Sequence, residues 1–225
     1  MSHGAVLFDL DGTLSESAPG ILASARHALS VLGEPIPSEA QLLRFIGPPL
    51  VDSFREVCGL DPVLAQRAVA AYRAFYAEHG QFDTRVYDGM PEVLAALRGR
   101  GRTVAVATSK AQVFAESVLA HLGLAPLVDL VVGAELDGRR TRKSEVVAHV
   151  LAQLPEPAAA GAVMVGDRHH DVEGAAAHGL PCIGAVWGYG GRQELRAAGA
   201  VALAERPEDL PALLGLGPGS PQPRS

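Results

Sequence analysis

The chain has 225 residues, of which 48% are hydrophobic and 20% are charged, as in ordinary globular proteins. Its formal net charge of -6 and the lack of a basic stripe disfavour nucleic acid as a partner, and no apolar run is long enough to span a membrane. Residues 1–4 lack the basic and hydrophobic regions of a signal peptide, so the expected location is the cytoplasm.

The first predicted strand covers residues 5–8 and leads directly into two aspartates, Asp9 and Asp11, within the sequence Phe-Asp-Leu-Asp-Gly-Thr-Leu. Open α/β sheets bind ligands at the carboxyl ends of their strands, so both carboxylates are expected at that edge. Neighbouring carboxylates raise each other's pKa unless a cation joins them. The pair therefore indicates a Mg²⁺ site, a carboxylate nucleophile or both, although an Asp-Gly turn that caps the next helix explains the same residues.

A helical insert follows over residues 16–86. Apolar residues at helical spacing begin at Ile21, and Gly33 with Pro35 ends the first helix. Shorter helices and a rigid, apolar Phe-Ile-Gly-Pro-Pro-Leu loop come next, and then a longer helix over residues 62–79.

From residue 87 onwards, short apolar strands alternate with helices. Buried, β-branched strands in such an alternation are typical of a parallel sheet that helices cover on both faces. We therefore predict an α/β fold, a Rossmann-like doubly wound parallel sheet formed by residues 1–15 and 87–216, with the insert at 16–86. Residues 217–225 are rich in Pro, Gly and Ser and are predicted to form a disordered tail. The strands are predicted at residues 103–107, 128–132, 162–165 and 182–186, with a last short strand and helix before 214.

Polar side chains follow three of these strands at the edge that parallel strands share. Each has an ordinary explanation by itself: Thr108 and Ser109 can cap a helix, and Lys143 can be a solvated helix residue. Together, hydroxyl groups with free backbone N–H groups, an ammonium group and four carboxylates describe a phosphate held by donors beside a Mg²⁺ site. The residues in question are Asp9, Asp11, Thr108, Ser109, Lys110, Lys143, Asp167 and Asp171.

The choice of basic residues adds to this pattern. Lysine occurs only at Lys110 and Lys143, and the other 17 of the 19 basic residues are arginine. A compact ammonium group suits a phosphate oxygen or a carboxylate cluster, so both positions can have a specific need for it. Cys58 and Cys182 are far apart and are interpreted as small hydrophobic residues, without a disulfide or a metal.

In combination, the motifs resemble those of the haloacid dehalogenase-like superfamily over nearly the whole chain. Phe-Asp-Leu-Asp-Gly-Thr-Leu is similar to its nucleophile motif, Ala-Thr-Ser to the second motif, Lys143 to the third and Gly-Asp-Arg-His-His-Asp to the fourth. The insert has the position of the helical cap in the phosphoglycolate phosphatase-like branch. The Phe-Ile-Gly-Pro-Pro-Leu and Val-Trp-Gly-Tyr-Gly sequences resemble a subgroup described as 5′-nucleotidase- or phosphotyrosine-phosphatase-like.

The resemblance implies a Mg²⁺-dependent phosphatase that acts on phosphoglycolate, nucleoside monophosphates or sugar phosphates. The expected state is a monomer or a homodimer. The resemblance also implies that Asp9 attacks phosphorus and forms an aspartyl-phosphate, while Asp11 protonates the leaving oxygen and later activates water. It further implies that Thr108 and Ser109 bind phosphoryl oxygens and that Lys143 neutralises charge. The implied Mg²⁺ ligands are Asp9, the Asp11 backbone carbonyl and Asp167. Asp171 is implied to support these ligands without binding the ion itself.

Several other activities are weighed against this expectation. Asp11 favours phosphoryl chemistry over dehalogenation, and the lack of lysine in residues 16–86 disfavours phosphonate hydrolysis through a Schiff base. A phosphosugar mutase of the same superfamily remains an alternative, although such mutases carry a histidine where this chain has Ile21. A phosphoacceptor signalling domain or a non-catalytic binding protein is a further alternative, which the early acceptor position and the complete set of acids and lysine disfavour.

Some residues near these motifs are left without a firm role. His169 and His170 are set aside as metal ligands because an oxygen-rich site prefers Mg²⁺. Trp187 and Tyr189 can shape the pocket or pack in the core. The candidates for substrate contact in the insert are Arg44, Phe45, Pro48 and Arg73.

Overall fold

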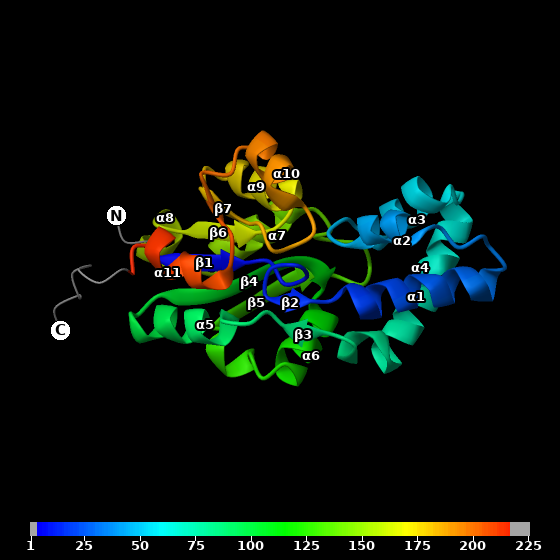
Figure 1. Ribbon diagram of the computed structural model, residues 1–225, viewed down its shortest axis with the longest axis horizontal. Helices are drawn as coiled ribbons and strands as arrows, with labels where there is room; N and C mark the ends of the chain where they lie inside the picture. Colours follow the sequence, from blue (N-terminus) through cyan, green and yellow to red (C-terminus); the bar gives the residue numbers. More distant parts are fainter. Residues whose placement is uncertain (1–3, 217–225) are drawn as a thin grey trace.

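The computed structural model describes residues 4–216 and contains a six-stranded parallel sheet (Figure 1). Its strand order is β5-β4-β1-β6-β7-β8, so β1 lies in the interior between β4 and β6. This confirms the predicted α/β class. The strands are β1 (Ala5–Phe8), β4 (Thr103–Ala111), β5 (Leu130–Ala134), β6 (Val163–Gly166), β7 (Cys182–Ala185) and β8 (Ala202–Ala204).

Helices cover both faces of the sheet, because alternate side chains of each strand point to opposite faces and both sets are apolar. In β1, Val6 and Phe8 belong to one buried cluster, whereas Ala5 and Leu7 belong to the other. The first face is covered by α5 (Met90–Gly99), α6 (Gln112–His121) and α11 (Leu210–Leu213), and the second by α7 (Lys143–Leu151), α8 (Glu156–Ala160), α9 (His169–Ala176) and α10 (Gly191–Ala198). Two 3₁₀ turns, η3 (Ala125–Leu127) and η4 (Pro207–Asp209), complete this part.

The helical insert has an apolar core of its own, beyond one end of the sheet (Figure 1). Leu29 of α1, Phe54 of α3 and Tyr72 of α4 all lie in this core. We call this segment the cap, and its boundaries at residues 16–86 stay a prediction. Its elements are α1 (Ala18–Leu32), α2 (Glu39–Leu42), η1 (Leu43–Phe45), α3 (Leu50–Cys58), α4 (Pro62–Glu78) and η2 (Gly80–Phe82).

A two-stranded antiparallel sheet joins the cap to the rest of the chain. It consists of β2 (Ser15–Glu16) and β3 (Arg85–Val86), with Ser15 opposite Val86. An ion pair between Arg85 and Glu16 closes its outer side. This sheet was not predicted, because two residues are too few to show the alternation of a strand.

Other elements also differ from the prediction, among them β5, which lies two residues later than predicted, and α8, which was not predicted. β4 continues to Ala111 with an irregular register after Ala107, so the predicted strand ended four residues too early. α9 begins at His169, two residues before the predicted start. α10 was not predicted, because Leu195 is its only buried residue and a single apolar side chain shows no periodicity. The predicted tail at 217–225 lies outside the described residues.

Candidate active site

The turn after β1 places both predicted aspartates at the carboxyl edge of the sheet. The backbone N–H of Asp9 donates to the Val165 carbonyl of β6, at 3.0 Å. Gly12 then turns the chain with a φ of 91°, and a Cβ atom there would lie 2.3 Å from a carboxylate oxygen of Asp167. The turn therefore needs glycine both for its backbone angle and for the close approach of Asp167. Asp9 and Asp11 are 4% and 8% exposed.

Lys143, the first residue of α7, joins two of the carboxylates. Its Nζ donates to Asp9 Oδ1 at 2.7 Å and to the Ala107 carbonyl at 2.9 Å, and it lies 2.8 Å from Asp171 Oδ1. Burial alone would lower the pKa of Lys143, but the Asp171 and Asp9 carboxylates raise it above its usual range. Lys143 therefore stays an ammonium group at neutral pH and balances Asp9.

Lys110 holds the other aspartate of the pair. Its Nζ donates to both carboxylate oxygens of Asp11, at 2.9 and 2.7 Å. The sequence placed Lys110 at the carboxyl edge of the sheet and indicated a phosphate oxygen or a carboxylate as its partner, but it did not indicate which one. The pairing depends on the extension of β4 beyond Ala107, which the strand prediction missed.

Three carboxylates form a group that could hold a metal ion: Asp9, Asp167 and Asp171 are buried, with ligand atoms within 4.8 Å of one another. Asp167 accepts hydrogen bonds from Thr13 Oγ1 at 3.2 Å and from the backbone N–H of Tyr189 at 2.8 Å. Asp171 Oδ2 accepts from the backbone N–H of Arg168, at 3.0 Å. A close group of carboxylate oxygens of this kind suits a hard cation.

Burial makes these carboxylates costly to keep charged without a cation. It raises the pKa of Asp9 to about 6, where Lys143 opposes the effect and Asp171 adds to it. Burial, with the charges of Asp171 and Asp9, also raises the pKa of Asp167. When all four carboxylates are ionised, they and the two ammonium groups have a formal net charge of -2, which one divalent cation balances.

The hydroxyl groups predicted to bind phosphate lie next to this group. Thr108 is 1% exposed, and its Oγ1 accepts a hydrogen bond from the backbone N–H of Lys110 at 3.2 Å. Ser109 is half-buried. Both line the cavity that Asp9 and Asp11 also face.

That cavity lies between the sheet edge and the cap and has a volume of about 170 Å³. Its floor is polar, whereas the cap side is largely apolar and aromatic. Of the four cap residues predicted to contact substrate, Phe45, Pro48 and Arg73 line the cavity and Arg44 is not among its lining residues. The apolar cap side is formed chiefly by Ile21, Phe45, Leu50, Val69, Tyr72 and Tyr76.

Residues 6–185 match the sequence profile of the family described as haloacid dehalogenase-like hydrolase. The chain belongs to this family. The resemblance of the motifs is thereby confirmed, and so is the superfamily prediction made from them.

Individual relatives show which members of this family the chain is most informatively compared with. It is 45% identical to a protein of Pseudomonas aeruginosa named 5′-nucleotidase, over 85% of this chain and 86% of the relative. It is 46% identical to the tyrosine-protein kinase PtkA of Mycobacterium tuberculosis, over 82% of this chain but only 62% of that protein. The crystal structure of a predicted phosphatase from Clostridium acetobutylicum superposes with a TM-score of 0.90 at 37% identity, covering 95% of this chain and 99% of the other.

Polar contacts hold the cap of the hydrolase over the cavity from both sides. Arg168, in the loop after β6, donates to the Ile46 carbonyl of the cap. Arg73 of α4 donates to the carbonyl of Leu136, in the loop after β5, at 2.8 Å. We call this arrangement, in which the cap contacts both loops beside the cavity, the closed state.

Trp187 and Tyr189 line no part of this cavity. The indole N–H of Trp187 donates to the Thr13 carbonyl at 3.1 Å, and the Tyr189 hydroxyl accepts from the backbone N–H groups of Ser17 and Ala18. Both side chains thus brace the turn after β1 and the start of the cap, which sequence spacing of more than 170 residues could not indicate.

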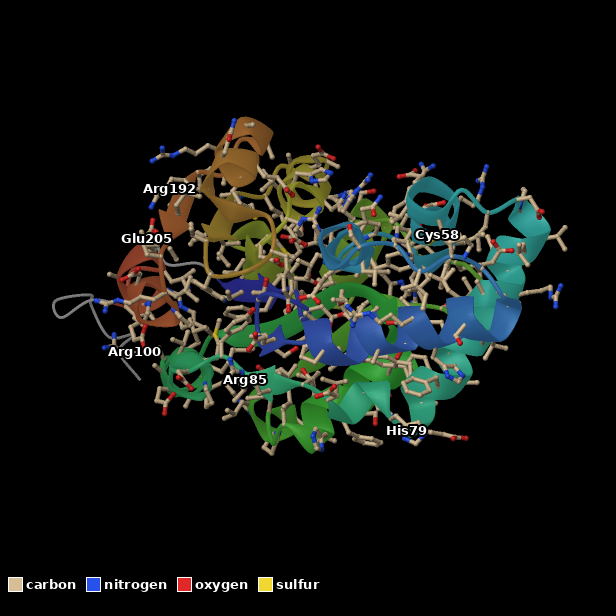
Figure 2. All side chains as sticks on the ribbon, turned by 45° about the vertical axis from the view of Figure 1, so that its right-hand side comes forward. Cys58, His79, Arg85, Arg100, Arg192 and Glu205 are labelled. Carbon is tan, nitrogen blue, oxygen red and sulfur yellow. The ribbon has the colours of Figure 1, made fainter. Side chains whose placement is uncertain are left out.

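The histidines stand outside the carboxylate group. His169 Nδ1 lies 2.7 Å from Glu194 Oε1 of α10. With His170 and Glu173, His169 forms a second group of potential metal ligands among residues 4–216, more exposed than the first. The two thiols also lie apart, with Cys58 in the cap (Figure 2) and Cys182 buried in β7. No helix within residues 4–216 combines the length and apolar composition that crossing a membrane requires.

Proposed function

We propose that this hydrolase is a divalent-metal-dependent phosphatase that removes phosphate from small phosphomonoesters through a covalent intermediate on Asp9. The observation that carries the proposal is the environment of Asp9: a buried carboxylate on a closed cavity, held by Lys143 and adjoining the Asp167 and Asp171 carboxylates. An ammonium partner that fixes a buried carboxylate at a cavity wall positions it for nucleophilic attack on a substrate in that cavity.

Each residue then has one part in the reaction. A carboxylate oxygen of Asp9 attacks phosphorus, and the bond between phosphorus and the leaving oxygen breaks as Asp11 gives that oxygen a proton. Asp11 then takes a proton from a water molecule whose oxygen attacks phosphorus, and the bond to Asp9 breaks. Thr108 and Ser109 donate hydrogen bonds to the phosphoryl oxygens, and Lys143 balances the charge on Asp9.

The carboxylate group fits Mg²⁺ as the metal. Its donors are hard oxygen atoms, and burial makes their carboxylates costly to ionise without a cation. Asp9 and Asp167 would hold the ion. Asp171 is close enough either to bind the ion directly or to orient the other two carboxylates. When bound, the ion neutralises charge on the phosphoryl group and fixes its orientation. The Asp11 backbone carbonyl as a further ligand stays a prediction.

The relatives support hydrolysis of phosphate esters as the activity. The 5′-nucleotidase name makes nucleoside monophosphates the first substrate class to test, beside phosphoglycolate and sugar phosphates. The kinase name of PtkA belongs to a longer protein, of which this chain spans 62%. The location in the cytoplasm and the state as monomer or homodimer remain predictions.

A phosphate-release screen over a panel of phosphomonoesters with Mg²⁺ tests the proposal. Asp9→Asn should lower turnover by at least about 10³-fold at an unchanged fold, because an amide is no nucleophile while Lys143 keeps Asp171 as a partner. Phosphate release at the wild-type rate by the Asp9→Asn variant would contradict the assignment of Asp9 as the nucleophile. Phosphorus NMR on a hexose phosphate separates hydrolysis from isomerisation by a mutase, and labelled ATP with a tyrosine peptide separates it from kinase activity.

A further inference from the structure

Each of the two lysines of this chain binds one aspartate of the Asp-x-Asp pair: Lys143 binds Asp9 and Lys110 binds Asp11. Phosphate binding does not explain the role of Lys110. Its Nζ donates to both carboxylate oxygens of Asp11, at 2.9 and 2.7 Å. The side chains of Lys110 and Asp11 are only 7% and 11% exposed. A bond to each oxygen fixes the rotation of the carboxyl group as well as its place.

The other side of Lys110 is covered by the cap. Its Nζ lies 4.7 Å from the ring centre of Tyr76 in α4, within the range of a cation–π contact. The Tyr76 ring stacks on Tyr72 at 5.6 Å with an interplanar angle of 8°, and Phe114 of α6 meets it edge-on at 5.3 Å. The ammonium group of Lys110 therefore has two kinds of partner. The carboxylate of Asp11 comes from the loop after β1, and the aromatic ring of Tyr76 comes from the cap.

We propose that Lys110 is a positioning residue that aims the Asp11 carboxyl group, and that Tyr76 completes its site only when the cap is closed. This inference rests on the proposed function, since it concerns the proton transfers assigned to Asp11. During the reaction, one carboxyl oxygen of Asp11 keeps its bond to Lys110, which suffices to hold the group. The other oxygen leaves Lys110 and binds the leaving oxygen of the substrate in the first step and water in the second. Cap opening withdraws the Tyr76 ring and admits water to the ammonium group, which frees Asp11 to rotate.

The arrangement ties proton transfer to the closed state of the enzyme. Closure of a lid commonly completes a catalytic arrangement while it excludes bulk water. Here the same α4 helix that lines the cavity with Tyr72 and Arg73 also supplies the ring over Lys110. An enzyme with its cap open would hold Asp9 in place through Lys143, whose partners Asp9, Ala107 and Asp171 lie outside the cap, but would leave Asp11 poorly aimed.

The test compares leaving groups in two variants. Lys110→Met keeps an unbranched side chain of nearly the same length and removes its charge, and Lys110→Arg keeps the charge. An alkyl phosphate needs a proton on its leaving oxygen, whereas a nitrophenyl phosphate does not. For Lys110→Met we expect kcat/KM to fall on the order of 10²-fold with the alkyl ester and less than about 10-fold with the nitrophenyl ester, with a burst of nitrophenol before slow turnover. Lys110→Arg should restore part of the loss.

A merely structural role of Lys110 predicts a different result. It would lower the melting temperature and reduce kcat/KM equally for both esters, without a burst. That outcome, or wild-type kinetics with both esters, overturns the proposal. A wild-type enzyme that releases no phosphate from any ester with Mg²⁺ overturns the proposed function instead.

Amine footprinting tests the structural half without any turnover. Wild-type protein is treated with an acetylating reagent, and mass spectrometry follows Lys110 with Lys143 as the internal reference. Tyr76→Leu should raise the rate at Lys110 at least about 5-fold relative to Lys143. Without the ring, the nitrogen atom is less covered and loses a contact that favours its unreactive protonated form. Tyr76→Phe keeps the ring and should keep the wild-type rate. Equal rates in Tyr76→Leu and Tyr76→Phe contradict the cap-dependent site even if the enzyme is an active phosphatase.

Discussion

Asp9 and Asp11 are separated by one residue, yet each is held by a lysine from a different element. Lys143 comes from the start of α7 and Lys110 from the end of β4. A compact ammonium group can serve two acceptors in a small buried space, which a planar guanidinium group cannot do as freely. This accounts for the two lysines in a chain whose other basic residues are all arginine.

Thr108 offers the sharpest test of phosphate binding by a single residue. Thr108→Val keeps the shape of the side chain and removes the hydroxyl group, so we expect kcat/KM to fall by about 10- to 100-fold, the effect of one hydrogen bond to a charged group. Thr108→Ser retains the hydroxyl group and serves as the matched control. Steady-state phosphate release measures both variants, and an equal loss in the two would assign the effect to packing.

At the scale of elements, a connection outside the cavity holds the start of the cap. Ser17, at the N-terminus of α1, makes no side-chain capping bond. The hydroxyl group of Tyr189, from the loop after β7, accepts from the backbone N–H groups of Ser17 and Ala18 at 3.1 and 3.0 Å instead. The backbone N–H of the same Tyr189 donates to Asp167, so one residue connects the carboxylate group to the first cap helix.

Tyr189→Phe separates these two contacts. Loss of the hydroxyl group leaves two helix-terminal N–H groups without their acceptor, so the free energy of unfolding should fall by about 1 kcal/mol, as for a lost helix cap. The backbone bond to Asp167 does not depend on the side chain. Urea unfolding measures the loss, and Mg²⁺ titration should show affinity equal to the wild type. A weakened Mg²⁺ affinity at unchanged stability would reverse the assignment.

At the scale of the whole molecule, the closed cap and the sheet edge enclose charges that need a cation. Burial raises the pKa of Asp9 to about 6 in the metal-free protein, above the ordinary value of 3.8. Between these two values the folded protein binds more protons at Asp9 than the unfolded chain does. The contribution of Asp9 to stability therefore falls as the pH rises through about 6 in the absence of metal.

Metal binding should reverse this loss, because a cation binds the deprotonated carboxylates. We expect Mg²⁺ to raise the melting temperature clearly at pH 7.5 and only slightly at pH 5, and EDTA to remove both the gain and the activity. Thermal unfolding with and without Mg²⁺ at the two pH values measures the effect. A gain that is equal at both values would mean that the ion binds elsewhere.

The sequence alone determined the α/β class, the parallel sheet and the residues that follow its strands, because these depend on local periodicity and on the rule that parallel strands share one carboxyl edge. Their predicted chemical roles await the tests above. Only the tertiary structure decided that Lys110 pairs with Asp11 under Tyr76, that Tyr189 caps α1, and that β2 pairs with β3. Such contacts join residues 34 to 172 positions apart, and no local pattern encodes them. Chain folding brings these groups together, and packing then determines which charges meet.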